Sequence, residues 1–195
     1  MDRLDLKELH FIAPIENLSL IIQHGILSNT NSKRLKVKTV ALEAVQKIRA
    51  EKVVPNGRPL HNYANLYISA RNPMMYKRRN LELAVVRVSM DVLDLPGVVI
   101  ADGNAASEYT AFWSSPAGLL KINKDKVFAE SWIDNDPIEQ HVRRRVKCAE
   151  VLVPDKIDPK FITGFYVPNA ELKTKVSEIV GSFSVDVNAH LFFRD

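Results

Sequence analysis

Polar and aromatic side chains are closely mixed over residues 60–76, in a stretch whose alternation is otherwise that of a β-strand. A period of two places Leu66 and Ile68 on one apolar face. Asn65 and Tyr67 fall on the opposite face, which is hydrogen-bonding and aromatic. That second face is suited to a polar ligand, whereas an ordinary core strand carries apolar residues there.

The same stretch ends at a sharp turn. The residue before a proline is pushed out of the α region and the proline fixes its own φ, so Asn72-Pro73 breaks the strand. The turn leaves Tyr67 and Arg71 near the end of the strand, which is a common way to line a ligand cleft. The alternative is a half-exposed strand with a solvated arginine.

Glu150 is the sharpest single candidate for catalysis. It lies in a strand-like run and shares a face with Cys148, which puts a carboxylate among apolar neighbours. Carboxylates are almost never fully buried unless they are paired, so a lone strand glutamate usually stands at a solvated edge. Its candidate partners stand at the ends of three other predicted elements: His10, Arg49 and Tyr67.

Simpler interpretations of these residues stay open. Taken singly, His10 suits a core or edge position, and Arg49 suits the last turn of a helix, where a cation complements the helix dipole. Cys148 with His141 would suggest a thiol nucleophile, but only a nearby basic run is present to activate it. The sequence has no GxGxxG, GxxxxGK[ST] or GxSxG pattern, which removes the simplest support for Rossmann, P-loop and α/β-hydrolase chemistry.

Length and composition predict a single domain over residues 1–195, long enough for one well-filled core and short for two. Apolar residues at 46% and charged residues at 26% are ordinary for a globular protein. The longest apolar runs are strand-sized, so we expect no membrane span. The N-terminus alternates charged and apolar residues without the apolar segment of a signal peptide, which indicates a cytoplasmic location.

Metal binding is not expected. The single cysteine, Cys148, excludes an internal disulfide and a cysteine-rich zinc site. The five histidines show no ligand spacing.

The net charge is +4, but the clustering of the basic residues matters more than the sum. Three basic clusters are visible: Lys33, Arg34, Lys36 and Lys38; Lys77, Arg78 and Arg79; and Arg143, Arg144 and Arg145 with Lys147. A single run of this kind is usually a solvated face. Three of them, two beside candidate site segments, favour a polyanionic partner.

The pattern along the chain predicts an α+β domain with mixed or antiparallel sheets. A first strand at residues 10–12 precedes a helix capped by Asn17 and stopped by Gly25. A second helix ends near Arg49, and its predicted core face is Val40, Ala44, Val45 and Ile48. Later strands are predicted at residues 81–88, 98–102, 150–153, 162–167 and 183–191, and helices at 138–146 and 169–180.

The segment 103–127 has the weakest pattern. Tyr109 and Trp113 stand there in a predicted loop or short helix, and aromatic residues at that density in a loop often face a ligand. They could equally provide the loop's own packing.

Several of these segments together resemble one known family. They are residues 10, 16–22, 25–28, 46–49, 60–76 and 149–154. In order and spacing, along nearly the whole chain, they are similar to the DarT family of DNA ADP-ribosyltransferase toxins. The stretch 60–76 and the Ala-Glu-Val-Leu-Val strand that contains Glu150 are the most specific matches.

The resemblance implies an ADP-ribosyltransferase fold, a split pair of β-sheets that grips NAD in the cleft between them. Glu150 would be the catalytic glutamate, and Arg49 would sit at the reaction centre. His10, Asn17 and Tyr67 would line the NAD site.

The residue types suit this chemistry. Breaking the bond between nicotinamide and ribose builds positive charge on the ribose, which a carboxylate such as Glu150 can stabilise. The pyrophosphate of NAD needs cationic donors, and the nicotinamide ring needs an aromatic or apolar face. Arg71 and Tyr67 could supply these.

The resemblance also implies the partners. The family attaches ADP-ribose to a base in single-stranded DNA and is typically paired with a macrodomain antitoxin, DarG. Basic clusters would steer the DNA phosphates and aromatic residues would hold the bases. On this basis the DNA-contacting residues are expected to be Lys77, Arg78 and Arg79 along the path, with Tyr109 and Trp113 as the stacking surface.

Two other functions stay open. The same fold could act on RNA or on protein, because target choice depends on loops. The domain could also be a catalytically silent module that binds NAD or nucleic acid, although the presence of Glu150 counts against silence. The modified base, its sequence context and the oligomeric state are not predicted.

Overall fold

The computed structural model describes residues 1–35, 37–38 and 43–194; two positions named above, Lys36 and Val40, lie outside these residues. The strands are β1 (Leu9–Pro14), β2 (Ile26–Leu27), β3 (Tyr63–Tyr67), β4 (Leu83–Val88), β5 (Val99–Ala101), β6 (Phe112–Ser114), β7 (Glu150–Pro154), β8 (Lys156–Ile157), β9 (Ile162–Val167) and β10 (Val185–Val187). The α-helices are α1 (Leu18–His24), α2 (Asn29–Ser32), α3 (Glu43–Glu51), α4 (Pro73–Arg78), α5 (Lys124–Phe128), α6 (Pro137–Val146) and α7 (Ala170–Val180).

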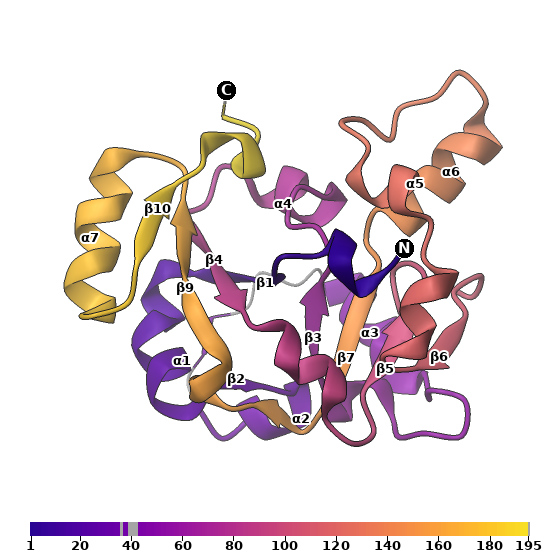
Figure 1. Ribbon diagram of the computed structural model, residues 1–195, viewed down its shortest axis with the longest axis horizontal. Helices are drawn as coiled ribbons and strands as arrows, with labels where there is room; N and C mark the ends of the chain where they lie inside the picture. Colours follow the sequence, from indigo (N-terminus) through magenta and orange to yellow (C-terminus); the bar gives the residue numbers. More distant parts are fainter. Residues whose placement is uncertain (36, 39–42, 195) are drawn as a thin grey trace.

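The main sheet is mixed and eight-stranded, in the order β10-β9-β4-β1-β3-β7-β5-β6, and β2 pairs separately with β8. Strands β9 and β10 are parallel, and the other pairs in the main sheet are antiparallel. β1 pairs with β4 along the whole length of both strands, but it shares only the pair His10–Tyr67 with β3. The sheet is therefore two half-sheets joined at one residue pair, with β9 and β4 in one half and β3 and β7 in the other (Figure 1).

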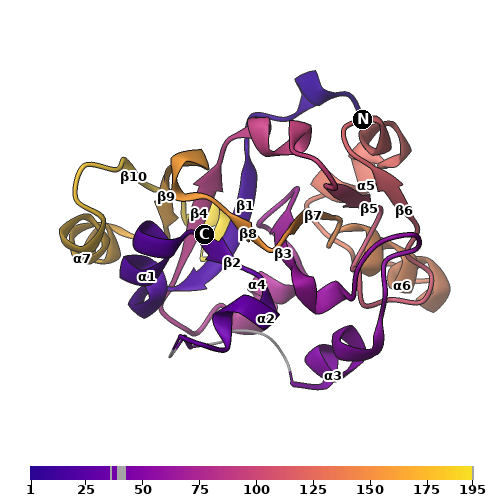
Figure 2. The same cartoon turned by 90° about the horizontal axis from the view of Figure 1, so that it is seen from below.

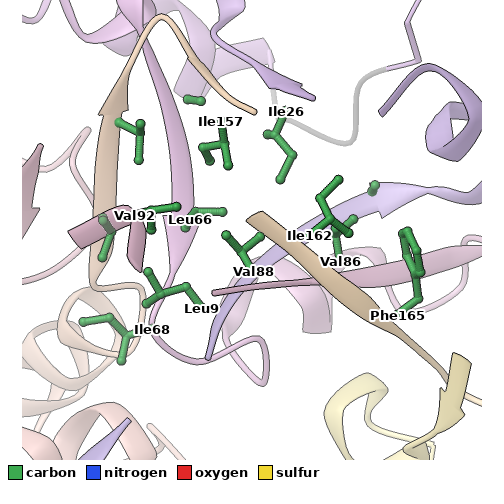
Figure 3. Packing of buried hydrophobic residues seen from close by; sticks show 14 of the residues in the cluster. Leu9, Ile26, Leu66, Ile68, Val86, Val88, Val92, Ile157, Ile162 and Phe165 are labelled. Carbon is green, nitrogen blue, oxygen red and sulfur yellow. The ribbon is translucent and has the colours of Figure 1, made fainter. Parts of the chain in front are cut away.

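One hydrophobic core covers the same face of both half-sheets, because alternate residues of each strand point into it. Figure 3 shows side chains from both halves packed together there, among them Leu9, Leu66, Val86, Val88 and Phe165. Burial of each such side chain stabilises the fold by about 1.5–3 kcal/mol. The predicted alternation in β3 is confirmed: Leu66 packs in this core, whereas Asn65 and Tyr67 face a cavity on the other side.

The boundaries of α1 agree with the sequence prediction. The helix follows Asn17 and ends at Gly25, where φ is +83°. A Cβ atom at position 25 would lie 2.0 Å from the carbonyl oxygen of Ile157 on β8, so both the backbone conformation and the close approach require glycine. Asn17 precedes the helix but makes no capping hydrogen bond within the described chain, because its side chain is used elsewhere.

Helices α1 and α7 pack side by side at one end of the molecule, next to β10 (Figure 1). In the part of the chain that the structure describes, no helix combines the length and the apolar character needed to span a membrane. Within the same residues, no group of three or more His, Cys, Asp or Glu side chains is placed to hold a metal ion.

The last predicted strand, over residues 183–191, is wrong in extent. Only Val185–Val187 pairs with β9. Asn188 then starts the 3₁₀ helix Ala189–Phe192, because its side chain accepts a hydrogen bond from the backbone N–H of Leu191. The turn capped by the Asn188 side chain therefore replaces the continued strand that the alternating pattern predicted.

The predicted core face of the second helix is also wrong. In α3 the buried side chain is Arg49, whereas Ile48 is 51% exposed and Ala44 is exposed as well. Seen from below, α3 lies at the edge of the molecule, away from α1 and α7 (Figure 2). Its inner side, with Val45 and Arg49, therefore faces a cavity instead of a core.

Lys147, from the third basic cluster, is buried instead of solvated. Its exposed fraction is 1%, and its Nζ donates to the carbonyl oxygen of Val127 at 2.9 Å. Burial lowers the pKa of Lys147 to about 8; the charge of Glu130 opposes this shift and that of Arg71 adds to it. Burial of the protonated Lys147 amine is unfavourable, so it lowers the free energy of unfolding at neutral pH.

The pKa of Lys147 is lower in the folded protein than in the unfolded chain, so the unfolded chain binds more protons between about pH 8 and pH 10.5. Lys147 therefore adds to the free energy of unfolding a contribution that rises with pH over this window, by up to about 3 kcal/mol at 1.36 kcal/mol per pKa unit, whereas the raised pKa of the Cys148 thiol acts in the opposite direction above about pH 9. Lys147→Met removes the titrating group, so the free energy of unfolding of this variant should lack the Lys147 contribution to the pH dependence. Urea denaturation of both proteins across the window measures the difference, and parallel curves would contradict it.

Candidate active site

A cavity of about 670 Å³ lies on the second face of the sheet, where β1 and β3 diverge beyond their single shared pair. This volume is in the range of small-molecule and cofactor sites. Residues of α1, α3, α4, α6, β1 and β3 line it, and the polar side chains include Asn17, Arg49, Asn65, Tyr67, Lys77 and Arg144. The split of the sheet thus opens a recess whose walls are largely apolar and carry several polar side chains.

Glu150 lies beneath this cavity, opposite Tyr67 on β3 and Ala101 on β5. Its exposed fraction is 1%, and Arg49 Nη1 lies 3.2 Å from Oε1 and 3.1 Å from Oε2. Among the described residues, Arg49 lines the cavity and Glu150 does not, so Arg49 connects the carboxylate to the cavity wall. The structure therefore brings together three predicted residues, Glu150, Arg49 and Tyr67.

The backbone supplies a further contact to the carboxylate. The N–H of Ala105 donates to Glu150 Oε1 at 2.9 Å. An ionised carboxylate only accepts hydrogen bonds, and bonds to a charged group are stronger than neutral ones. The Glu150 side chain is thereby held in one orientation, with Arg49 balancing its charge.

Two neighbours of Glu150 stay protonated at neutral pH. Burial raises the pKa of Tyr67 well above 10, and the charge of Glu150 adds to this shift. Burial raises the pKa of the Cys148 thiol to about 12, again with help from Glu150. Cys148 is therefore a poor nucleophile, which agrees with the lack of an activating context in its sequence.

Asn17 lines the cavity and also holds the chain segment that follows α2. Its Nδ2 donates to the carbonyl oxygen of Lys38 at 2.6 Å, and its Oδ1 accepts from the Lys38 N–H at 3.0 Å. Both ends of the amide are committed to Lys38, which explains why Asn17 does not cap α1. The Asn17 side chain thus fixes one wall of the cavity.

His10 is not among the described residues that line the cavity, although it stands opposite Tyr67 across the split. Its Nε2 lies 3.4 Å from Glu8 Oε1, and its Nδ1 lies 3.3 Å from the carbonyl oxygen of Ile68. Burial raises the pKa of Glu8, but hydrogen bonds from His10 and other neighbours outweigh this and lower it to about 2. The structure places His10 in an ion-pair network next to the cavity, and its role toward NAD stays a prediction.

Arg71 is likewise not one of the described residues that line the cavity. Its guanidinium stacks over the Phe193 ring at 4.1 Å from the centroid and donates to the carbonyl oxygen of His190. Its Nε lies 3.4 Å from Glu130 Oε2. These contacts with the C-terminal segment and with Glu130 are not indicated by the sequence pattern, and the role of Arg71 toward NAD stays a prediction.

The second basic cluster is divided. Lys77 lines the cavity, whereas Arg78 and Arg79 are not among its lining residues in the described chain. The Arg79 guanidinium lies over the Tyr76 ring, 4.0 Å from the centroid, and donates to the Tyr76 carbonyl oxygen. Of the three cations predicted along a DNA path, Lys77 is the one that the structure places at the cavity.

The two predicted stacking residues differ as well. Tyr109 is 76% exposed and packs edge-on against His141, which itself lines the cavity, with ring centroids 6.3 Å apart. Trp113 is paired with Ile100, a residue of the main core, so it points to the sheet face opposite the cavity. A Cβ at Gly118 would lie 2.9 Å from the Trp113 Cβ, which shows how closely that side is packed. The placement therefore contradicts Trp113 as part of a stacking surface at this cavity.

Sequence reasoning missed several residues of the site. Ala105 acts through its backbone N–H, which leaves no side-chain signal. Arg144 and Arg145 line the cavity, but their run resembled a solvated face. The helical period of residues 137–146 could have shown that these two arginines point in different directions from Arg143.

Comparison with known proteins agrees with this geometry. A family model described as "ssDNA thymidine ADP-ribosyltransferase, DarT" matches residues 10–193. A Thermosipho africanus protein named "DNA ADP-ribosyl transferase-DNA ADP-ribosyl glycohydrolase fusion protein" is 29% identical over 93% of this chain and 47% of its own length. A Thermus aquaticus "DNA ADP-ribosyl transferase" is 26% identical over 90% of this chain and 81% of its own length. The chain thus spans about half the length of the Thermosipho relative.

Solved structures show the same architecture. "Thermosipho africanus DarTG in complex with ADP-ribose" has a TM-score of 0.82 and 28% identity, covering 96% of this chain and 51% of its own. "Thermus sp. 2.9 DarT in complex with ADP-ribosylated ssDNA" has a TM-score of 0.81 and 21% identity, covering 95% of each chain. The predicted α+β fold with a split sheet of the ADP-ribosyltransferase type is confirmed.

Removing either partner of the Arg49–Glu150 pair should destabilise the protein, because the other charge then stays buried without its counter-ion. We expect a loss on the order of 3 kcal/mol for Arg49→Ala or Glu150→Ala, and a double variant that loses less than the sum of the two. Urea denaturation of the four proteins measures the coupling energy. Strictly additive losses would show that the two side chains do not interact in solution.

Proposed function

This chain belongs to the DarT family of ssDNA thymidine ADP-ribosyltransferases, and we propose from that premise that it transfers ADP-ribose from NAD to thymidine in single-stranded DNA. The observation that carries the proposal is the carboxylate of Glu150, buried beneath the cavity and held by Arg49 and the Ala105 N–H. The proposal treats residues 1–195 as one catalytic domain.

The cavity is suited to NAD. Its volume of about 670 Å³ matches a dinucleotide-sized ligand, and its apolar walls suit a nicotinamide or adenine ring. Lys33, Lys38 and Lys77 also line it, which suits the two negative phosphates of the pyrophosphate. Asn17 and Tyr67 are the predicted NAD-site residues that stand in its wall.

Glu150 would act on the charge that develops during the reaction. NAD supplies an activated ribose, because nicotinamide leaves with the electron pair of the bond that joins it to the ribose carbon. Positive character then grows on the ribose, and a fixed carboxylate stabilises it more than it stabilises the bound ground state. The acceptor base forms the new bond to the same carbon and releases one proton.

Arg49 would stay paired with the Glu150 carboxylate until the substrates are bound. In the structure its guanidinium pairs with Glu150, and Arg49 is also a lining residue of the cavity, so one residue contacts both the proposed catalytic group and the space for the ligand. A planar guanidinium can exchange a carboxylate for a phosphate or a base edge while it keeps its charge. This supports the placement of Arg49 at the reaction centre.

The acceptor would approach over the cationic side of the cavity. Lys77 and Arg144 line it from α4 and α6, and the Tyr109–His141 ring pair stands beside them. A base in a single strand needs little unstacking before it reaches the ribose, whereas a duplex base must first be extruded. The Thermus structure with ADP-ribosylated single-stranded DNA supports this acceptor class.

We also propose a partner protein that removes the ADP-ribose from the modified DNA. The Thermosipho relative carries a DNA ADP-ribosyl glycohydrolase in the same chain, and this protein matches only about half of that chain. We expect a separate or fused glycohydrolase, the DarG-like macrodomain antitoxin, to remove the modification made by this domain.

Glu150→Gln should lower transfer to a thymidine-containing oligonucleotide by at least about a hundredfold, because the amide keeps hydrogen-bonding groups but loses the negative charge. Labelled NAD is incubated with the oligonucleotide, and the gain in mass of the DNA is followed. Glutamine is preferred to alanine because it does not leave Arg49 beside a void.

The control is the same oligonucleotide with each thymidine replaced by cytidine, and parallel reactions contain RNA or a mixed protein acceptor. Label on the thymidine-free strand, RNA or protein would move the function to another acceptor. If the Glu150→Gln variant keeps more than about a tenth of wild-type transfer, Glu150 does not have the catalytic role.

The cationic side of the cavity should make DNA binding depend on salt. Each phosphate neutralised contributes roughly −0.7 to the log–log slope of affinity against salt for a single strand. The double variant Lys77→Gln/Arg144→Gln should therefore flatten the slope by about 1.4 and weaken binding similarly for different sequences. Fluorescence titrations of an oligonucleotide at several salt concentrations measure this.

The matched control is Lys173→Gln, which removes a charge from the exposed surface of α7, a helix that contributes no residue to the cavity lining in the described chain. Its slope should equal that of the wild type. A double variant with the wild-type slope would mean that DNA reaches the cavity by another side.

A further inference from the structure

The loop that carries the Ala105 N–H lies between β5 and β6, and we refer to residues 103–110 as the Ala105 loop. Ala105 has no exposed surface, and its N–H points at Glu150 Oε1. All residues of this loop are described and none lies in a helix or strand. Its backbone forms turns, in which the Ser107 N–H donates to the Asn104 carbonyl oxygen and the Thr110 N–H donates to the Ser107 carbonyl oxygen. Side chains of Lys52 and Arg145 tie these turns to the rest of the molecule. The position of the Ala105 N–H therefore depends on the contacts that anchor the loop.

Arg145, at the C-terminal end of α6, contacts both ends of the loop. At the first end, its Nη1 lies 2.7 Å from Asp102 Oδ1, and its backbone carbonyl accepts from the Asn104 N–H at 3.0 Å. At the other end, the same Nη1 lies 3.4 Å from Thr110 Oγ1. Thr110 Oγ1 in turn donates to the Asn104 carbonyl oxygen at 2.7 Å, which closes the loop on itself.

The backbone at Gly103 packs closely against Arg145. A Cβ at Gly103 would lie 2.7 Å from Arg145 Nη1 and 2.9 Å from its carbonyl oxygen, so the loop approaches too closely for any other residue. The side chains of Arg145 and Asp102 are 13% and 21% exposed, which makes their contact an enclosed pair and not a surface one. Asp102 Oδ1 also accepts from the Ala111 N–H at 3.0 Å.

We propose that Arg145 is a positioning residue for Glu150: it anchors the Ala105 loop through Asp102, Asn104 and Thr110, and so keeps the Ala105 N–H on the carboxylate. The catalytic consequence rests on the proposed function, whereas the anchoring itself does not. One basic run thereby has more than one task, since Arg144 and Arg145 both line the cavity and Arg145 also holds the loop.

Arg143 is a matched control in the same run. It pairs with Asp134 and Glu139 within its own part of the chain and, among the described residues, makes no hydrogen bond or ion pair with the Ala105 loop. Arg143→Ala removes the same charge from the same helix. Comparison of the two alanine variants separates loss of the anchor from loss of a positive charge.

The experiment follows the Ala105 N–H directly. Amide hydrogen exchange is measured by NMR in the wild type, Arg145→Ala and Arg143→Ala, with the Val151 amide of β7 as an internal reference for global opening. We expect exchange at Ala105 to accelerate by about tenfold or more in Arg145→Ala, relative to Val151, and to stay within about twofold in Arg143→Ala. With NAD and oligonucleotide, kcat should fall by about tenfold or more in Arg145→Ala, by a larger factor than KM rises.

Two milder variants keep the test decisive if Arg145→Ala does not fold. Asp102→Asn retains an oxygen for the Ala111 N–H but loses the charge facing Arg145, and should also accelerate exchange at Ala105. Arg145→Lys keeps one contact to Asp102 and should restore part of the protection and of kcat.

Wild-type protection at Ala105 in Arg145→Ala or Asp102→Asn would overturn the proposal. A rise in KM with unchanged kcat would overturn it as well, because the loop would then act on binding and not on Glu150. If the wild type transfers no ADP-ribose, the proposed function fails, and exchange at Ala105 still decides whether Arg145 anchors the loop.

Discussion

One buried carboxylate organises the active region. An ionised side chain with 1% exposure is destabilising unless a counter-charge and hydrogen-bond donors are delivered to it. Helix α3 delivers the Arg49 guanidinium, and the loop after β5 delivers a backbone N–H. Two segments that are distant in the sequence are thereby fixed to Glu150, and the walls of the cavity follow from where those segments must lie.

This requirement explains which side of α3 is buried. An amphipathic helix normally buries its apolar stripe, but here Ile48 is half-exposed while Arg49 is buried. The pairing of a guanidinium with a carboxylate beneath it decides which side of the helix faces inward. The sequence pattern misleads at this helix because periodicity reports the hydrophobic effect and contains no information about a charge on a strand elsewhere in the chain.

Local physics made other parts predictable. The alternation in β3 and the Asn72-Pro73 turn depend on neighbouring residues alone, and Asn72 indeed caps α4 by accepting from two backbone N–H groups. The surroundings of Arg71 and Trp113 depend on which remote segment packs beside them, and no pattern within either segment reports that. Glu150 lies between these cases: its residue type and strand position suggested a role, but its pairing with Arg49 needed the tertiary structure.

The seam between the half-sheets has a thermal consequence. One backbone residue pair and the contact of His10 with the Ile68 carbonyl cross it directly, whereas the apolar core spans both halves beneath. The width of the recess is therefore set mainly by apolar cohesion and little by a hydrogen-bonded ladder. Such cohesion weakens on cooling and in dilute urea. We therefore expect the seam to loosen in the cold before the ladders within each half.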